Sequence, residues 1–296
     1  MDSGMDTEVQ LSLSGICKQF RQTTGRKRGR GGSAPRPDAP PVPVLADVNF
    51  EVREQEFVAV IGPSGCGKTT LIKIIHGLLP AEHGVVELNG KPVTNPSTAC
   101  GFVFQHAGLL PWRTAQKNVE FGLETKGVAR AERARVAEEA LTLVGLTGFE
   151  DYYPHQLSGG MQQRVGLARA LARGPDVLLM DEPFGALDAQ TRERMQEELL
   201  KINELTKKTV VFVTHDLDEA VYLADRVVVL AARPGRVREI VDINLPRPRP
   251  PAADTKSMAE FVDKRRLIWS LINTPADPVD AADPVDPVDS VSGVRA

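Results

Sequence analysis

The chain alternates between short apolar runs and longer segments in which apolar residues recur at helical spacing. The apolar runs have the length and the β-branched content of buried strands, and they lie at residues 57–61, 177–180, 210–213 and 227–230. Helical segments are expected after these runs, at residues 68–77, 190–206 and 217–223. In the second of these helices, Met195, Leu199 and Ile202 share one face. Strands that alternate with helices predict an α/β fold whose core sheet is mostly parallel and covered on both faces.

A long segment rich in Ala, Glu and Arg interrupts this alternation between Gln105 and Asp176. Its helical pattern predicts a subdomain at about residues 106–173, inserted into an α/β domain that spans residues 1–245. The chain then becomes proline-rich, and residues 246–272 are expected to form a linker and a final helix. The apolar face of that helix is expected to comprise Met258, Phe261, Val262, Trp269 and Ile272.

Two segments have compositions that cannot supply a hydrophobic core. Residues 25–43 are rich in Arg, Gly and Pro and predict a flexible insertion between strands. A basic run of this kind can also contact anionic lipid or nucleic acid, but we favour the solvated insertion. Residues 273–296 repeat Asp-Pro-Val, which predicts a disordered tail, with an acidic interaction tail as the alternative.

The composition narrows the class of protein further. The chain has 296 residues, of which 42% are hydrophobic and 25% charged, as in a soluble globular protein of one or two domains. Its net charge of -3 gives no electrostatic argument for a nucleic-acid partner. No apolar stretch reaches about 18 residues, and the beginning of the chain lacks the pattern of a signal peptide, so we expect neither a membrane span nor secretion. The three cysteines, too widely spaced for a disulfide framework or a zinc cluster, favour a reducing compartment; they are Cys17, Cys66 and Cys100.

A glycine-rich loop follows the first buried strand and precedes a helix, in the pattern G-x-x-x-x-G-K-[ST]. Its glycines let successive backbone N–H groups approach an anion, and the next helix adds its positive N-terminal end. We therefore predict a nucleotide site, with Lys68 on the β- and γ-phosphates and the Thr69 hydroxyl on Mg²⁺. A redox switch at Cys66 is one interpretation, and a position that tolerates many side chains is the one we favour. The expected binding residues of this segment are Gly62, Pro63, Ser64, Gly65, Cys66, Gly67, Lys68, Thr69 and Thr70.

Two acids come directly after the apolar run at 177–180. Asp181 is expected to lie near Mg²⁺ through water, and Glu182 to point into the cleft. A carboxylate there can orient the attacking water and accept its proton, and such a base typically contributes about 10²–10⁴-fold to a rate. The alternative, an acid pair at the start of a helix, is disfavoured by Pro183 and by the position immediately after a strand.

The segment Leu157–Gln163, with the sequence LSGGMQQ, lies between the phosphate loop and the two acids. In this order the three segments resemble the ATP-binding-cassette (ABC) ATPases, and the resemblance covers residues 9–243. It implies a P-loop NTPase cassette with a mostly parallel core sheet, an antiparallel β edge and an inserted helical subdomain. It also implies ATP and Mg²⁺ as the cofactors.

The resemblance implies roles for residues outside these segments. Gln105 matches the family's glutamine that senses the γ-phosphate and can ligate Mg²⁺. His215 matches the histidine that steadies the attacking water beside the catalytic carboxylate. Phe20 lies where the family places an aromatic ring under adenine, although it could equally be a core residue. Asp188 ends a Gly-Ala-Leu-Asp segment that is expected at the subunit interface.

A shared site follows from the same resemblance. It implies that Ser158, Gly159 and Gly160 of one subunit cover the γ-phosphate of an ATP bound to the other. Ser158 is also a good N-cap, so these residues begin a helix whose N-terminus favours an anion. Two ATPase subunits, identical or paired homologues, are therefore expected to close around ATP and to separate after hydrolysis, a population shift driven by ligand.

The residues around the motifs are similar to those of ATPase subunits from nitrate, taurine and aliphatic-sulfonate importers, at positions 109–112, 181–188 and 230–237. This similarity implies that hydrolysis drives a separate integral-membrane permease, served indirectly by a solute-binding protein. The subunit is then expected at the cytoplasmic face of the cell membrane, as a peripheral protein without a nucleic-acid partner. Trp112 is expected to face the permease, with packing inside the subdomain as the alternative.

Two other functions compete with import. A soluble ABC ATPase that acts on ribosomes or nucleic acid usually has two cassettes or long inserts, and the chain has one cassette without such an insert. A P-loop kinase or another NTP-using enzyme would need an acceptor motif and would leave the LSGGMQQ segment unexplained. We therefore expect the ATP-hydrolysing subunit of an importer.

Overall fold

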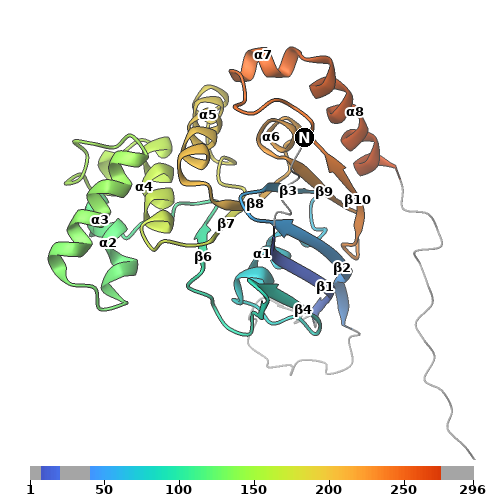
Figure 1. The fold of residues 1–296 in the computed structure, drawn as a ribbon, viewed down its shortest axis with the longest axis horizontal. Helices are drawn as coiled ribbons and strands as arrows, with labels where there is room; N and C mark the ends of the chain where they lie inside the picture. The colour runs from blue at the N-terminus through green and yellow to red at the C-terminus, as the bar shows by residue number, and fades with distance from the viewer. Residues whose placement is uncertain (1–7, 21–40, 275–296) are drawn as a thin grey trace, which may run out of the picture.

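The computed structural model describes residues 8–20 and 41–274, which contain two β-sheets flanked by helices (Figure 1). The larger sheet has the order β10-β9-β3-β8-β7-β6, in which the strands from β9 to β6 are parallel and β10 is antiparallel. Its strands are β3 (Phe57–Ile61), β6 (Cys100–Val103), β7 (Val177–Asp181), β8 (Thr209–Thr214), β9 (Arg226–Leu230) and β10 (Val237–Asp242). The mostly parallel core sheet predicted from the sequence is confirmed.

Both faces of this sheet are buried, which explains why its strands are continuous apolar runs. Successive side chains of β3 point to opposite faces, so that Phe57, Ala59 and Ile61 belong to one core while Val58 and Val60 belong to the other. All five side chains are completely buried.

A smaller antiparallel sheet covers one face, and its strand order is β2-β1-β4-β5. The strands are β1 (Val9–Phe20), β2 (Val42–Arg53), β4 (His83–Leu88) and β5 (Lys91–Pro92). Helix α1 (Lys68–His76) packs into the same core through Leu71, Ile72 and Ile75. This sheet is the predicted antiparallel edge. Strand β2 already includes Val42 and Pro43, the last residues of the predicted insertion, and residues 25–40 lie outside the described part.

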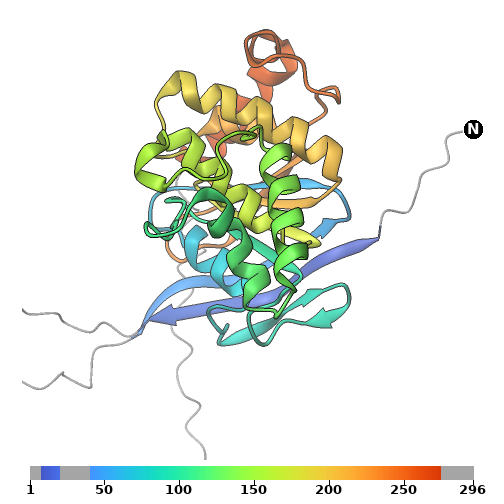
Figure 2. The same ribbon diagram turned by 90° about the vertical axis from the view of Figure 1, so that its left-hand side faces the viewer.

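Three helices form a separate lobe, seen at the left of Figure 1 and facing the viewer in Figure 2. They are α2 (Ala115–Glu124), α3 (Arg130–Leu143) and α4 (Gly159–Leu171). Val119, Leu141 and Val165 are completely buried between them. The last helix leads into β7, so the lobe is connected directly to the core sheet.

The other face of the core sheet is covered by α5 (Ala189–Thr206) and α6 (Leu217–Leu223), followed by α7 (Ala252–Ser257) and α8 (Ala259–Asn273). The predicted apolar face of the last helix is wrong at Trp269, which is 58% exposed. Ile268 is completely buried with Phe261 instead. Ile268 follows Phe261 by seven residues, so the two side chains point within about 20° of the same direction around the helix. Trp269 follows Phe261 by eight residues, so its side chain points about 80° away from that direction. Helix α8 includes Asn273, the first residue of the predicted tail at 273–296, and residues 275–296 lie outside the described part.

Candidate functional site

The phosphate loop, residues 62–67, joins the end of β3 to the start of α1. Gly65 and Gly67 have φ values of 80° and 99°, in the left-handed region where residues other than glycine are strained. Gly67 caps α1 without a side chain, so the first backbone N–H groups of the helix remain available to an anion. The loop borders a pocket of about 290 Å³, lined by Val44, Ser64, Gly65, Gly67, Lys68, Thr69, Thr70 and Glu182.

Lys68 is buried inside the loop rather than extended into solvent. Its Nζ donates hydrogen bonds to the carbonyl oxygens of Gly62 at 2.7 Å and Pro63 at 3.2 Å. These contacts place the positive charge beside the pocket, where backbone N–H groups and the helix N-terminus already favour an anion.

Thr69 and Asp181 meet at the end of the core sheet, although 112 positions separate them in the sequence. The Thr69 hydroxyl donates to Asp181 Oδ1 at 3.1 Å. Burial raises the pKa of the Asp181 carboxyl above its usual value, and the hydrogen bond from Thr69 acts in the opposite direction. Hydroxyl and carboxylate oxygens are the hard ligands that Mg²⁺ prefers, so this pair fits the ion.

Glu182 and His215 lie together at the carboxyl ends of β7 and β8. Glu182 Oε2 is 3.0 Å from His215 Nδ1. Glu182 has a φ of 45°, an uncommon conformation for a residue with a side chain, which costs about 1–3 kcal/mol. Its backbone N–H donates to the carbonyl oxygen of Val213 at 2.9 Å, which holds the strained turn against the neighbouring strand. The alternative of a helix-start acid pair is wrong, because α5 begins at Ala189.

Gln105 follows β6 and is exposed. A Cβ added to Gly185 would lie 3.5 Å from Gln105 Nε2 and 3.8 Å from Glu182 Oε2, so the amide and the carboxylate both lie close to Gly185. Gln163 of α4 fixes this segment, because its Nε2 donates to the Gln105 carbonyl oxygen at 2.6 Å. The sequence did not reveal this role of Gln163, since the contact spans 58 positions and leaves no local pattern.

The Ser158 segment lies on the helical lobe and is absent from the residues that line the Lys68 pocket. Ser158 caps α4, and its Oγ accepts from the Met161 N–H at 3.3 Å, as its N-cap position predicts. Asp188 caps α5 in the same way, since Oδ1 accepts from the Thr191 N–H at 3.0 Å, and these backbone contacts lower the pKa of its carboxyl. Both caps are exposed, so each can meet another molecule.

Phe20 ends β1 and pairs with Val42 of β2. Its ring is 43% exposed, with Lys18 Nζ 5.5 Å from the ring centroid. Phe20 does not line the phosphate-loop pocket, whose wall on this side is Val44, two residues along β2. The sequence did not point to Val44, because its apolar side chain reads as an ordinary strand residue.

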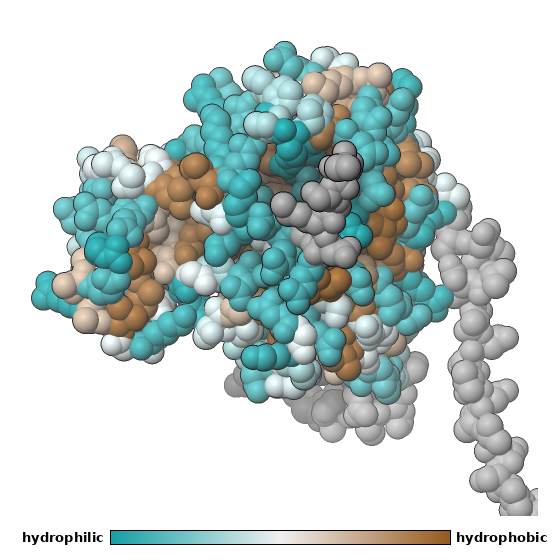
Figure 3. Space-filling view, viewed as in Figure 1, coloured by the Kyte–Doolittle hydropathy of each residue, from teal (hydrophilic) through white to brown (hydrophobic). Residues whose placement is uncertain are grey.

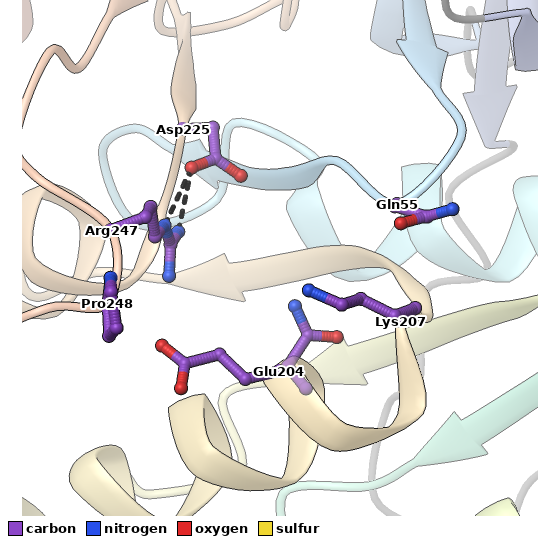
Figure 4. A pocket seen from close by; sticks show the side chains of 7 residues that line it. Gln55, Glu204, Lys207, Asp225, Arg247 and Pro248 are labelled. Atoms are coloured by element: carbon purple, nitrogen blue, oxygen red, sulfur yellow. Dashed lines mark hydrogen bonds and ion pairs between the residues drawn. The ribbon is translucent and has the colours of Figure 1, made fainter.

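A second pocket, of about 370 Å³, lies at the opposite edge of the core sheet (Figure 4). Asp225 accepts from Arg247 Nε at 2.9 Å through Oδ1 and from the Phe57 N–H at 2.9 Å through Oδ2. The acidic side chains that line this pocket are matched by an equal number of basic ones, and none of its lining residues is a glycine. Asp225 therefore secures the amino end of β3, whereas the phosphate loop lies at the carboxyl end of that strand. The lining residues are Gln55, Asn203, Glu204, Lys207, Asp225, Arg247 and Pro248.

Comparisons with known proteins show the family of this chain. A family model for the ABC transporter matches residues 45–185. An uncharacterized ABC transporter ATP-binding protein of Methanocaldococcus jannaschii is 57% identical over 231 residues, which are 78% of this chain and 85% of that protein. The taurine import ATP-binding protein TauB of Escherichia coli (strain K12) is 47% identical over 234 residues, 78% of this chain and 91% of TauB.

A solved structure matches the fold as well. It is the dimeric, post-hydrolysis state of an ATP-binding cassette bound to ADP and Pi, with a TM-score of 0.65 and 34% identity. The match covers 79% of this chain and 99% of the solved one. Among the described residues, no helix is both long enough and apolar enough to cross a membrane. The chain therefore belongs to the ABC transporter ATP-binding proteins, and it is the ATP-binding subunit, an ATPase, of such a transporter.

Proposed function

We propose that two of these subunits hydrolyse ATP in shared sites and drive a separate permease that imports taurine, aliphatic sulfonates or nitrate. The observation that carries the hydrolytic part is the meeting of Thr69, Asp181, Glu182 and His215 at one edge of the sheet, beside the phosphate loop. These side chains come from three separate segments of the chain, and each has the chemistry that phosphoryl transfer needs at that place.

The proposed reaction transfers the γ-phosphoryl group of ATP to water. The Glu182 carboxylate takes a proton from the water while the water oxygen attacks the γ-phosphorus. The bond between the γ-phosphorus and the oxygen that bridges it to the β-phosphate breaks, which gives ADP and phosphate. The His215 imidazole, 3.0 Å from the Glu182 carboxylate, orients that water and the γ-phosphate. Lys68 and the N–H groups of the phosphate loop hold the β- and γ-phosphates. Mg²⁺, when held by Thr69, Asp181 and Gln105, supplies charge neutralisation.

The shared site rests on where the signature segment lies. Ser158, Gly159 and Gly160 begin α4 on the helical lobe, and none of them lines the pocket of Lys68 in the same subunit. In the proposed dimer they close over the γ-phosphate of the partner's ATP, with the exposed Asp188 at the interface. The dimeric arrangement of the solved cassette supports this proposal. Phe20 is proposed to contact the adenine next to Val44.

The permease is proposed to dock on the helical lobe. Trp112 precedes α2 and is 71% exposed, so it is not packed inside the subdomain. Phe121 of the same lobe is also exposed, and Figure 3 shows hydrophobic patches among polar ones on this part of the molecule. Exposed aromatic groups of this kind are typical of protein interfaces. The subunit would then be peripheral, at the cytoplasmic face of the membrane, and a solute-binding protein would deliver the cargo to the permease.

The cargo is proposed from the similarity to TauB, whose name assigns taurine import to that protein. The direct assay is co-purification with a permease, followed by reconstitution and measurement of ATPase activity stimulated by each candidate cargo. Stimulation by taurine or alkanesulfonates through the solute-binding protein supports the proposal. Equal ATPase activity with and without each cargo contradicts the assignment of import.

Glu182→Gln tests the hydrolytic proposal. The amide cannot accept the proton, so turnover is expected to fall about 10²–10⁴-fold while ATP binding persists. With Mg-ATP, size-exclusion chromatography is expected to show a dimer for this variant. The control is Glu138→Gln, an exposed carboxylate on α3, which is expected to hydrolyse ATP at the wild-type rate. A monomer with bound Mg-ATP, or full turnover in Glu182→Gln, would contradict the proposal.

A further inference from the structure

Arg192, in the first turns of α5, contacts both the Gly185–Asp188 loop and the turn that carries His215. Its Nη2 donates to the carbonyl oxygen of Leu187 at 3.0 Å. Its Nη1 lies 3.5 Å from Asp216 Oδ2, and its Nε lies 3.9 Å from Glu219 Oε1. The three nitrogens of one rigid guanidinium thus face three partners on two different segments.

Glu219 is the anchor of this arrangement on α6. Its side chain is nearly inaccessible to solvent, and burial raises the pKa of its carboxyl. The Thr214 hydroxyl donates to Oε2 at 2.5 Å, and Gln196 Nε2 donates to Oε1 at 3.2 Å. Buried polar groups that satisfy one another in this way fix their backbone positions closely.

The residues on both sides of His215 belong to this network. Thr214 Oγ1 accepts from the Asp216 N–H at 3.0 Å, and Asp216 Oδ1 accepts from the N–H of Glu219 at 3.1 Å as the cap of α6. The His215 side chain itself is 61% exposed and contacts Glu182. Because the ring has little other packing, the direction of the imidazole depends on the backbone turn from Thr214 to Asp216 together with the contact to Glu182.

We propose that Arg192 is a positioning residue that ties the Gly185–Asp188 loop to the His215 turn, so that a partner subunit on Asp188 sets the imidazole against Glu182. This inference rests on the proposed function, since it requires a shared site. Nothing in the guanidinium contacts involves the phosphate loop, so Arg192 has no part in holding ATP. Its loss is expected to slow hydrolysis within the closed dimer and to leave ATP binding intact.

Arg192→Ala is the principal variant. A displacement of about 1 Å at a reacting group can cost about 10²-fold, so kcat is expected to fall about 10- to 100-fold with a change in KM for ATP below about 3-fold. The matched control is Arg194→Ala, which removes an exposed arginine from the same helix and is expected to keep the wild-type kcat. Arg192→Lys, which cannot present three donors in a fixed plane, is expected to give an intermediate kcat and serves if the alanine variant does not fold.

The decisive measurement is a double-mutant cycle of Arg192→Ala with His215→Ala. If Arg192 acts through His215, the double variant is expected to be no slower than His215→Ala alone. Rate losses that multiply, or an unchanged kcat in Arg192→Ala, overturn the inference. The shared site is tested separately, by size-exclusion of Glu182→Gln and of Glu182→Gln with Arg192→Ala. Both variants are expected to be dimers. If the single variant Glu182→Gln is a monomer, the proposed function is contradicted. If Glu182→Gln is a dimer but the double variant is a monomer, the inference about Arg192 is contradicted.

Discussion

Gly235→Ala is expected to weaken ATP binding from a position to which the sequence assigned no role in the nucleotide site. Gly235 lies in the loop between β9 and β10, against the back of the phosphate loop. A Cβ added there would lie 2.0 Å from the carbonyl oxygen of Cys66, about 1.4 Å short of an ordinary contact. The obstacle is backbone, so no side-chain rotation relieves it. The φ of Gly235 is not in the left-handed region, so the effect is a clash rather than backbone strain.

Gly235 cannot retreat without breaking two hydrogen bonds. Its N–H donates to the Val44 carbonyl oxygen at 2.8 Å, and its own carbonyl oxygen accepts from the Ala46 N–H at 3.0 Å. Overpacking of this kind costs about 1–3 kcal/mol. If the phosphate loop moves to relieve the clash, that free energy is lost from binding, and the Kd for ATP rises about 5- to 150-fold.

The assay is a titration of a fluorescent ATP analogue, with thermal unfolding measured in parallel. The control is Gly127→Ala, between α2 and α3, where a Cβ meets no heavy atom within 4 Å and φ is 73°. Gly127→Ala is expected to lower stability by about 1–2 kcal/mol through backbone strain and to leave ATP affinity unchanged. Wild-type ATP affinity in a folded Gly235→Ala variant would refute the reasoning that this glycine supports the phosphate loop.

Three further predictions concern the phosphate loop and the Ser158 segment. Lys68→Ala removes the buried ammonium, so ATP binding or hydrolysis is expected to be lost; wild-type ATPase activity would overturn the phosphate-loop assignment. Ser158→Arg places bulk and charge at the cap of α4, and it is expected to abolish hydrolysis while a single subunit still binds ATP, as measured by ATPase assay and nucleotide titration. Burial raises the pKa of the Cys66 thiol, so little thiolate exists at neutral pH. Treatment of the folded protein with an alkylating reagent is therefore expected to leave Cys66 unmodified, as detected by mass spectrometry. Rapid labelling of Cys66 in the folded protein would support the redox-switch interpretation instead.

The sequence predicted the site best where its chemistry is contiguous. The phosphate loop and the two acids at the carboxyl end of β7 are local patterns, and the structure places them beside one another. Val44 and Arg192 were not predicted, because each depends on contacts between distant segments and neither breaks the surrounding periodicity. The error at Trp269 has a different cause. A hydrophobic residue at roughly helical spacing can still point to solvent, because a pattern of apolar positions does not define the direction of each side chain closely enough.

The central claim is that each ATP site combines the phosphate loop of one subunit with the signature segment of another. It is tested most directly by mixing two inactive variants, Lys68→Ala and Ser158→Arg. A mixed dimer has one site with both halves intact, so an equal mixture is expected to recover about a quarter of the wild-type ATPase rate. If the mixture is as inactive as its two components, the site belongs to a single subunit and the account is contradicted.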